Sequence, residues 1–289
     1  MSVRTKRPDP LQTALCGILL HPAGHTRSPA MHRAAYESLR LNAHYQAFDV
    51  TADRLEAAVA GVRALGLKQV AVSIPHKEAM LALVDEVDEV ATRIGAINTV
   101  TRVGDRLVGT NTDWLGAVRA LESETTIAGR RAVVLGAGGT ARAVVFGLRE
   151  RGAEVFVLNR TRARAETVAL DLGAQGFGGL DELAALAPEL IVQTTSVGLR
   201  EDRSPVDQDA LPKGVVVLDA VYAPERTRLL ADVASRGGRP IAGKWMLVHQ
   251  AVEQLRLWTC ELPEPPDESA LARATEVMAA AFDDAAQPS

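Results

Sequence analysis

Three glycines form a short motif, Gly136-Ala137-Gly138-Gly139, between an apolar run at 132–135 and a helix-forming segment that begins near Thr140. An apolar run of this length is typical of a buried parallel strand. Glycines after such a strand allow a tight turn and a close backbone approach to a pyrophosphate, and the start of the next helix attracts the anion. The motif predicts a dinucleotide site, with an ordinary glycine-rich turn as the alternative.

The next strand-like run, 154–158, ends in Asn159, Arg160 and Thr161, and Arg164 follows one helical turn later. A site for NAD carries an acidic residue at this distance from the glycines, where it binds the ribose 2′-hydroxyl. Two guanidinium groups and a hydroxyl suit a 2′-phosphate instead. The pattern favours NADP over a solvated arginine cluster at the start of a surface helix.

Lys77 follows a strand-like run at 69–74 and Pro75, which suits the first position of a helix that we expect to continue to about residue 94. In the first turn of a helix the dipole disfavours an exposed cation by only tenths of a kcal/mol. Taken alone, Lys77 is interpreted as a solvated lysine.

Two strand-like runs, 98–103 and 106–111, are joined by a Gly-Asp turn that suits a two-residue β-hairpin. In that register Asn98 and Asn111 lie opposite each other, close to Asp113. Asp113 begins a helix-forming segment, and for an average aspartate in this place helix capping is the expected role.

Strand-like and helix-forming segments alternate along the chain, which predicts an α/β fold with mainly parallel sheets and binding loops at the carboxyl ends of the strands. The expected strands are 11–20, 45–48, 69–74, 132–135, 154–158, 190–194, 215–219 and 240–242. The expected helices are 30–39, 53–65, 246–258 and 269–282.

The composition indicates a globular chain of two domains, with 289 residues, 47% hydrophobic content and a formal net charge of −4. The charge gives no support for nucleic-acid binding. Cys16 and Cys260 have no metal or redox spacing, so we expect no metal site and a reducing, cytoplasmic location. We expect no membrane segment because there is no apolar span of about 20 residues.

The first residues resemble a signal peptide, because Arg4, Lys6 and Arg7 precede an apolar stretch. Pro8 and Asp9 break the pattern, and the stretch suits a first β-strand better. We therefore expect no secretion.

Eight ordered segments together point to one family. They are HTRSPAMH (25–32), SIPHK (73–77), GAINTV (95–100), GTNTDWLG (109–116), GAGGTARA (136–143), NRTRARA (159–165), DAVYAP (219–224) and GKWMLVHQ (243–250). With these segments the chain resembles shikimate dehydrogenases along nearly its full length. The resemblance implies reversible, NADPH-dependent reduction of 3-dehydroshikimate to shikimate, within the chorismate pathway of aromatic amino-acid biosynthesis.

The resemblance also assigns roles to individual residues. Lys77 and Asp113 would form the catalytic pair. Substrate would be held by Thr26, Ser28 and Tyr222 at its carboxylate and by Ser73, Asn98 and Gln250 at its ring hydroxyls. NADP would be held by Gly136, Ala137, Gly138 and Gly139 at the pyrophosphate, by Asn159, Arg160, Thr161 and Arg164 at the 2′-phosphate, by Ala220 and Gly243 near the nicotinamide, and by Glu89.

Each of these assignments has a structural alternative. Ser28 could cap the helix at Ala30, Tyr222 could be a packing residue, and Gln250 could be an exposed amide.

The chain departs from the family pattern at four positions. Thr26 and Ser73 stand where the family usually has Ser and Thr, and Ala71 and Gln193 stand where it often has Asn.

These departures leave the fine substrate preference open, while the retained Ser28 favours shikimate over the bulkier quinate. The alternatives are a quinate or aminoshikimate dehydrogenase of the same fold, or a non-catalytic NADP-binding sensor.

The order of the segments predicts two domains with the active site between them. Residues 1–112 and 245–289 would form an α/β substrate domain, and 113–244 a Rossmann-like NADP-binding domain. The resemblance is compatible with a homodimer.

Overall fold

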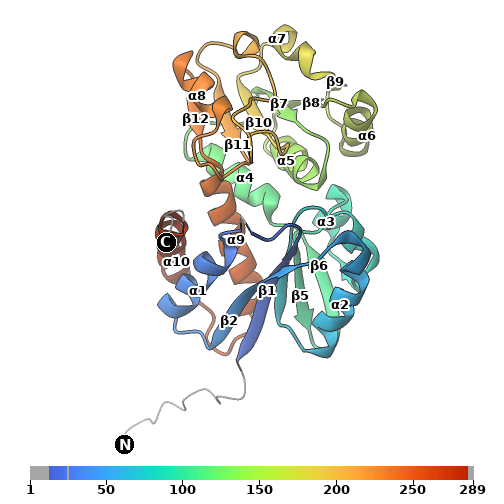
Figure 1. Ribbon diagram of the computed structural model, residues 1–289, viewed down its shortest axis with the longest axis vertical. Coiled ribbons are helices and arrows are strands. Elements are labelled where there is room, and N and C mark those ends of the chain that lie inside the picture. Colours follow the sequence, from blue (N-terminus) through green and yellow to red (C-terminus); the bar gives the residue numbers. More distant parts are fainter. Residues whose placement is uncertain (1–12, 25, 286–289) are drawn as a thin grey trace, which may run out of the picture.

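The computed structural model describes residues 13–24 and 26–285, which form two six-stranded sheets joined by two helices (Figure 1). The basic residues at positions 4, 6 and 7, and the first residues of the expected strand 11–20, lie outside the described part of the chain. None of the described helices is long and apolar enough to cross a membrane.

The first sheet has the strand order β2-β1-β3-β5-β6-β4 and is mixed. Strand β1 is parallel to β2 and β3, the pairs β3–β5 and β5–β6 are antiparallel, and β4 is parallel to β6. The strands are β1 (Ala14–Leu20), β2 (Ala43–Asp49), β3 (Gln69–Val72), β4 (Glu86–Val87), β5 (Thr99–Val103) and β6 (Arg106–Thr110).

The hairpin formed by β5 and β6 has the predicted register. Val103 pairs with Arg106 across the two-residue turn, and Thr110 accepts a hydrogen bond from the Asn98 backbone N–H at 3.1 Å. Asn98 and Asn111 therefore leave the hairpin side by side, immediately before Asp113.

Side chains of β1 alternate between two hydrophobic cores, as expected for a strand covered on both faces. Ile18 and Leu20 pack with α1, α9 and α10, whereas Leu19 packs with α2. The helices around this sheet are α1 (Ser28–Ser38), α2 (Leu55–Ala64), α3 (Glu89–Ile94), α9 (Gly243–Thr259) and α10 (Glu268–Asp284), with 3-10 turns at Ala52–Arg54 and Ala79–Ala82.

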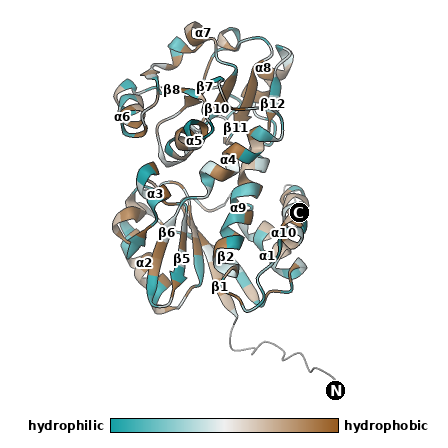
Figure 2. Ribbon diagram, turned by 180° about the vertical axis from the view of Figure 1, so that it is seen from behind, coloured by the Kyte–Doolittle hydropathy of each residue, from teal (hydrophilic) through white to brown (hydrophobic). Residues whose placement is uncertain are grey.

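The second sheet is entirely parallel, in the order β12-β11-β10-β7-β8-β9. Its central strands are mainly apolar, because both faces of the sheet are buried (Figure 2). The strands are β7 (Arg131–Leu135), β8 (Glu154–Leu158), β9 (Gly176–Gly178), β10 (Leu190–Gln193), β11 (Val216–Asp219) and β12 (Arg239–Ile241).

The chain reverses its direction of growth across this sheet between β7 and β10, and ligands of open parallel sheets bind at such a point. This architecture confirms the predicted Rossmann-like fold. The helices here are α4 (Asp113–Glu122), α5 (Gly139–Glu150), α6 (Arg162–Leu172), α7 (Leu183–Leu186) and α8 (Arg228–Ser235), with 3-10 turns at Leu180–Glu182 and Gln208–Ala210.

Helices α4 and α9 cross closely between the two sheets (Figure 1). A Cβ atom on Gly116 would lie 2.6 Å from the Met246 carbonyl oxygen, so only glycine allows this approach. The crossing joins the two halves of the molecule and forms one side of the space between them.

The prediction of one helix from Pro75 to about residue 94 is wrong. The Ile74–Pro75 peptide bond is cis, and Lys77 lies in a turn that precedes a 3-10 turn, β4 and the short α3. Lys77 is therefore not in the first turn of a helix, and the argument from the helix dipole does not apply to it.

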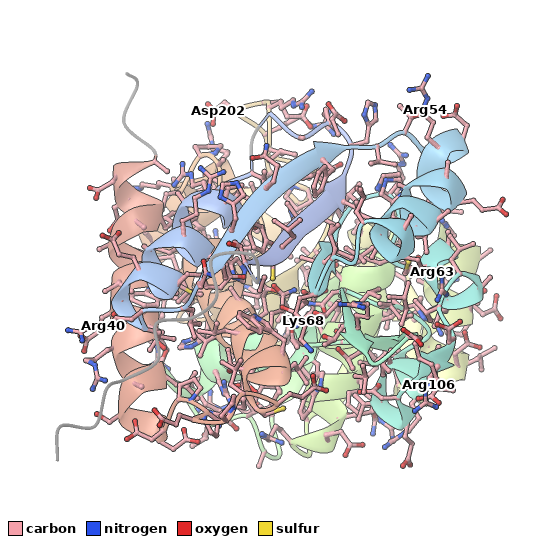
Figure 3. All side chains as sticks on the ribbon, turned by 90° about the horizontal axis from the view of Figure 1, so that it is seen from below. Arg40, Arg54, Arg63, Lys68, Arg106 and Asp202 are labelled. Atoms are coloured by element: carbon pink, nitrogen blue, oxygen red, sulfur yellow. The ribbon has the colours of Figure 1, made fainter. Side chains whose placement is uncertain are left out.

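Tertiary partners explain why this segment is not one helix. Asp85 accepts a hydrogen bond from the Leu107 N–H at 2.7 Å and pairs with Arg63 at 2.6 Å. Arg106 pairs with Glu86 next to it, and Figure 3 shows Arg63 and Arg106 on the same side of the molecule. These bonds hold Glu86–Val87 as β4 beside β6, which interrupts the expected helix.

A buried carboxyl group at the end of β11 should make stability depend on pH. Asp219 is fully buried and accepts hydrogen bonds from the Val221 N–H at 3.0 Å and the Thr227 hydroxyl at 2.6 Å. Burial raises the pKa of Asp219 from 3.8 to about 6. The folded state therefore binds the proton more tightly than the unfolded state does.

The contribution of Asp219 to the free energy of unfolding should be complete below about pH 4. It should be lost as the pH rises through 6, and the loss should be at most roughly 3 kcal/mol. Urea unfolding at pH 4.5, 5.5 and 7 should show this decline, and Asp219→Asn should remove it. Parallel pH profiles for the two proteins would contradict the assignment.

Candidate active site

A cavity of about 120 Å³ lies between the two sheets. It is bounded by residues that follow the carboxyl ends of β3, β10 and β11 and by the first residues of α4, α5 and α9. Seven residues that the sequence singled out line it: Ser73, Lys77, Asp113, Ala220, Tyr222, Gly243 and Gln250.

Lys77 and Asp113 form a buried ion pair at this cavity. The Lys77 Nζ lies 2.6 Å from Asp113 Oδ2, and their side chains are only 12% and 7% exposed. Removing two charges from water costs several kcal/mol per ion unless they are paired. The resemblance brought these two residues together, and the geometry agrees with it.

The remaining polar atoms of Asp113 are held by residues of the hairpin. Its Oδ1 accepts a hydrogen bond from Asn98 Nδ2 at 2.9 Å, and its backbone N–H donates to Asn111 Oδ1 at 3.0 Å. Thr112, not Asp113, occupies the capping position of α4. Capping as the role of Asp113 is therefore wrong, since its carboxylate turns toward Lys77.

Asn98 lies beneath the cavity and does not line it. Its amide nitrogen also donates to Thr112 Oγ1 at 2.9 Å and to Gln250 Oε1 at 3.3 Å. Gln250 in turn donates to the Leu247 carbonyl at 2.8 Å and is buried, so its interpretation as an exposed amide is wrong. Asn98 thus orients two residues that do line the cavity.

Thr140 contacts Lys77, and the sequence did not predict this contact. Lys77 Nζ donates a second hydrogen bond, of 3.0 Å, to Thr140 Oγ1 in the first turn of α5. Nothing in the sequence relates these two positions, because they come from different sheets.

The loop after β10, Thr194-Thr195-Ser196, also lines the cavity and was not assigned a role. The rule that ligands bind at the carboxyl ends of parallel strands could have indicated it.

The proposed carboxylate-binding residues contact one another through Thr26. The Thr26 side chain hydrogen-bonds Tyr222, and Thr26 Oγ1 accepts from the Ser28 N–H at 3.3 Å. Burial raises the pKa of Tyr222 to about 12, so this phenol stays a neutral donor. Tyr222 also packs edge-on against Phe282, at 6.0 Å between ring centroids, which agrees with the packing interpretation.

Ser28 does not cap its helix. Arg27 is the capping residue of α1, without a side-chain cap bond, and the helix begins at Ser28 instead of Ala30. Tyr222 lines the cavity, whereas Thr26 and Ser28 lie beyond the residues that do.

The glycine motif has the geometry that a pyrophosphate needs. Gly136 has a φ of +122°, and a Cβ there would lie 2.5 Å from Thr194 Oγ1, so this turn requires glycine. A Cβ on Gly138 would meet nothing within 4 Å, because this glycine faces open space. The open space lies at the start of α5, where free N–H groups bind anions.

The side chains after β8 are exposed and suit a 2′-phosphate. Within residues 13–24 and 26–285, the Arg160 and Arg164 side chains make no ion pair or hydrogen bond. The neighbouring Arg162 pairs with Glu182 and lies over the Phe177 ring. Asn159 donates to the Thr161 carbonyl at 3.0 Å. Two guanidinium groups without a partner in the described residues, those of Arg160 and Arg164, therefore follow the end of β8.

The other predicted cofactor residues fall into two groups. Ala220 and Gly243 line the cavity, and a Cβ on Gly243 would lie 2.5 Å from the Asp219 carbonyl oxygen. Glu89 is exposed in the first turn of α3 and does not line the cavity. Among the described residues, no group of three or more His, Cys, Asp or Glu side chains is placed to hold a metal.

Gly136 and Gly138 should respond differently to the same substitution. Gly138→Ala adds a methyl to empty space, so the melting temperature should stay near that of wild type, while NADP should bind at least about tenfold more weakly because the methyl blocks the close approach. Gly136→Ala should lower stability, by roughly 1–3 kcal/mol from backbone strain alone. Calorimetric titration and thermal unfolding measure both; unchanged NADP affinity in folded Gly138→Ala would contradict the pyrophosphate site.

Comparison with known proteins gives a consistent result along the chain. A family model described as the shikimate dehydrogenase substrate binding domain matches residues 18–100, and one described as shikimate / quinate 5-dehydrogenase matches residues 119–203. The shikimate dehydrogenase (NADP(+)) of Haloarcula marismortui is 44% identical over 247 residues, covering 85% of this chain and 93% of that protein. The enzyme of the same name from Thermococcus kodakarensis is 41% identical over 256 residues, covering 88% and 93%.

Solved structures show the same similarity. The shikimate 5-dehydrogenase of Thermus thermophilus, in complex with NADP(H) and shikimate, is 39% identical with a TM-score of 0.82, covering 92% of this chain and all of that one. A 5-ketofructose reductase from Gluconobacter is 32% identical with a TM-score of 0.80, covering 95% and 99%.

Proposed function

The chain belongs to the shikimate dehydrogenase family, and from this premise we propose how its own residues carry out the reaction. The protein reduces 3-dehydroshikimate to shikimate with NADPH, reversibly, in the pathway to chorismate and the aromatic amino acids. The observation that carries the mechanism is the 2.6 Å contact between Lys77 and Asp113 at the cavity between the two sheets.

Reduction of a ketone requires a hydride at carbon and a proton at oxygen. NADPH, when bound, supplies the hydride. Lys77 donates the proton and stabilises the negative charge that develops on the carbonyl oxygen, because its ammonium group has a third N–H beyond the two bonded to Asp113 and Thr140. In the reverse direction the same amine accepts the hydroxyl proton.

Asp113 orients Lys77 and exchanges protons with it. Its own carboxylate is fixed by Asn98 and by the α4 backbone, so the pair meets the substrate in one geometry. Asn98 thus contributes through Asp113 and Gln250, although the resemblance placed it on a ring hydroxyl.

Substrate is held by neutral donors around this pair. Thr26, Ser28 and Tyr222 bind the carboxylate at one end of the cleft, and Ser73 and Gln250 bind ring hydroxyls inside it. The hydrogen bond between the Thr26 and Tyr222 side chains and the one that the Ser28 N–H donates to Thr26 Oγ1 support this grouping.

The residues that would hold NADP lie at the carboxyl edge of the second sheet. The motif Gly136-Ala137-Gly138-Gly139 would bind the pyrophosphate, and Ala220 and Gly243 would hold the nicotinamide. Asn159, Arg160, Thr161 and Arg164 would bind the 2′-phosphate. Glu89 would also lie at the cofactor; its side chain is exposed in the first turn of α3.

The division into domains follows the hydrophobic cores. Residues of α9 and α10, including Val248, Trp258 and Phe282, share a core with β1 and β2, so 245–289 belongs with 1–112 as the substrate domain. Residues 113–244 then form the NADP-binding domain. We also propose a homodimer, and a cytoplasmic location that suits the free cysteines Cys16 and Cys260.

One observation favours a second substrate. A 5-ketofructose reductase shares 32% identity and nearly the whole length with this chain, so the fold accommodates other polyhydroxy ketones. Quinate and aminoshikimate are the substrates to compare with shikimate by kcat/KM. The ion pair between Lys77 and Asp113 argues against a non-catalytic NADP-binding sensor, which has no use for two buried charges.

Removing either charge of the pair should stop chemistry without preventing nucleotide binding. Lys77→Ala should lower kcat by about 10²–10⁴, the range for a positioned acid–base group, and NADP affinity should stay near that of wild type. Asp113→Asn should also slow turnover, and its amide oxygen can still accept from Asn98. Initial rates of shikimate oxidation, followed by NADPH absorbance, measure both; near-normal kcat in folded Lys77→Ala would remove this mechanism.

Two neighbouring arginines provide a matched test of cofactor choice. Arg160→Ala should weaken NADP binding by roughly 1.5–3 kcal/mol, as for a charge-assisted hydrogen bond, with little effect on NAD. Arg162→Ala should change neither, because Arg162 is already paired with Glu182. Equal losses of NADP and NAD affinity in Arg160→Ala would show that it does not bind the 2′-phosphate.

A further inference from the structure

The contact between Lys77 and Thr140 crosses from one half of the molecule to the other. Lys77 follows β3 of the first sheet, whereas Thr140 lies in the first turn of α5 on the second sheet. Thr140 directly follows the glycines that bind the pyrophosphate. The residue that would donate the proton is therefore bonded to the helix that would bind the nucleotide.

Close packing around Gly139 makes this contact possible. A Cβ on Gly139 would lie 3.0 Å from the Lys77 Cβ and 3.2 Å from the Ala96 Cβ. The start of α5 therefore lies directly against the stem of Lys77. This steric fit is independent of the hydrogen bond and places the Thr140 hydroxyl next to the ammonium group.

The number of N–H donors on Lys77 explains what the hydrogen bond to Thr140 can do. An ammonium group has three N–H donors in a tetrahedral arrangement. Asp113 Oδ2 accepts one at 2.6 Å and Thr140 Oγ1 accepts a second at 3.0 Å, and both acceptors line the cavity. With two donors fixed, the third has one direction left. Asp113 alone would leave the ammonium group free to rotate about a single bond.

The geometry points to Thr140 as a positioning residue for the proposed proton donor: its hydroxyl holds Lys77 Nζ, in the closed cleft, in the orientation that directs the third N–H at the substrate oxygen. The bond also links nucleotide binding to proton donation, because the helix turn that would bind the pyrophosphate is the one that orients Lys77. This inference rests on the proposed role of Lys77.

Two substitutions at Thr140 separate the hydroxyl from the shape of the side chain. Thr140→Val keeps the branched shape and removes the hydroxyl, and Thr140→Ser keeps the hydroxyl and removes the methyl. Thr140→Val should lower kcat for shikimate oxidation about 10- to 100-fold, the range for a hydrogen bond to a charged group. Thr140→Ser should restore most of the rate. KM for shikimate and Kd for NADP should stay within about twofold of wild type in both variants.

A matched control is Thr167→Val, the same change on α6, where the hydroxyl only donates to the Ala163 carbonyl of its own helix. Its kcat should equal that of wild type, and thermal unfolding confirms that all three variants are folded. The inference is overturned by unchanged kcat in Thr140→Val, by an equal loss in Thr140→Ser, or by a loss confined to NADP affinity, which would make Thr140 a phosphate ligand only. A wild-type protein that does not oxidise shikimate would instead overturn the proposed function.

Discussion

A charge that leaves water must find an opposite charge, and the cleft is built around that requirement. Lys77 and Asp113 are nearly inaccessible to solvent, and each would be strongly destabilising without the other. Asn98 and Asn111 are fixed in turn by the hairpin of β5 and β6, and they determine which way the carboxylate points. The same burial that makes the pair expensive to assemble strengthens its electrostatic effect on a bound ketone, because little water remains to screen it.

Much of this arrangement could be predicted because local patterns specify it. The apolar strands, the two-residue hairpin turn and the glycine motif each depend on neighbours in the chain, and the register of Val103 with Arg106 follows from the turn itself. The structure of the segment after Pro75 could not be predicted, because it depends on the contacts of Asp85 with Arg63 and with β6. Thr140 was missed for the same reason: its partner lies on the other sheet, and no spacing in the sequence reports a contact across a cleft.

The two sheets divide the work of recognition differently. The second sheet presents backbone N–H groups, glycines and uncommitted arginines, which suit the invariant phosphates of a nucleotide. The half that contains the first sheet presents a neutral hydroxyl and a neutral amide to the cavity, those of Ser73 and Gln250. A 5-ketofructose reductase that is 32% identical has the same fold, so the fold alone does not determine the ketone that is reduced.

Helices α9 and α10 pack on β1 and α1, at the opposite end of the chain, and this has a consequence for how the protein is made. When the ribosome has synthesised β1 to β6, Ile18 and Leu20 still lack α9 and α10, two of the three helices that pack on them. The whole second sheet must be translated first, which takes on the order of ten seconds at the usual rate of about 5–20 residues per second. The half that is synthesised first is thus completed last, and until then the part of its core that α9 and α10 cover stays exposed.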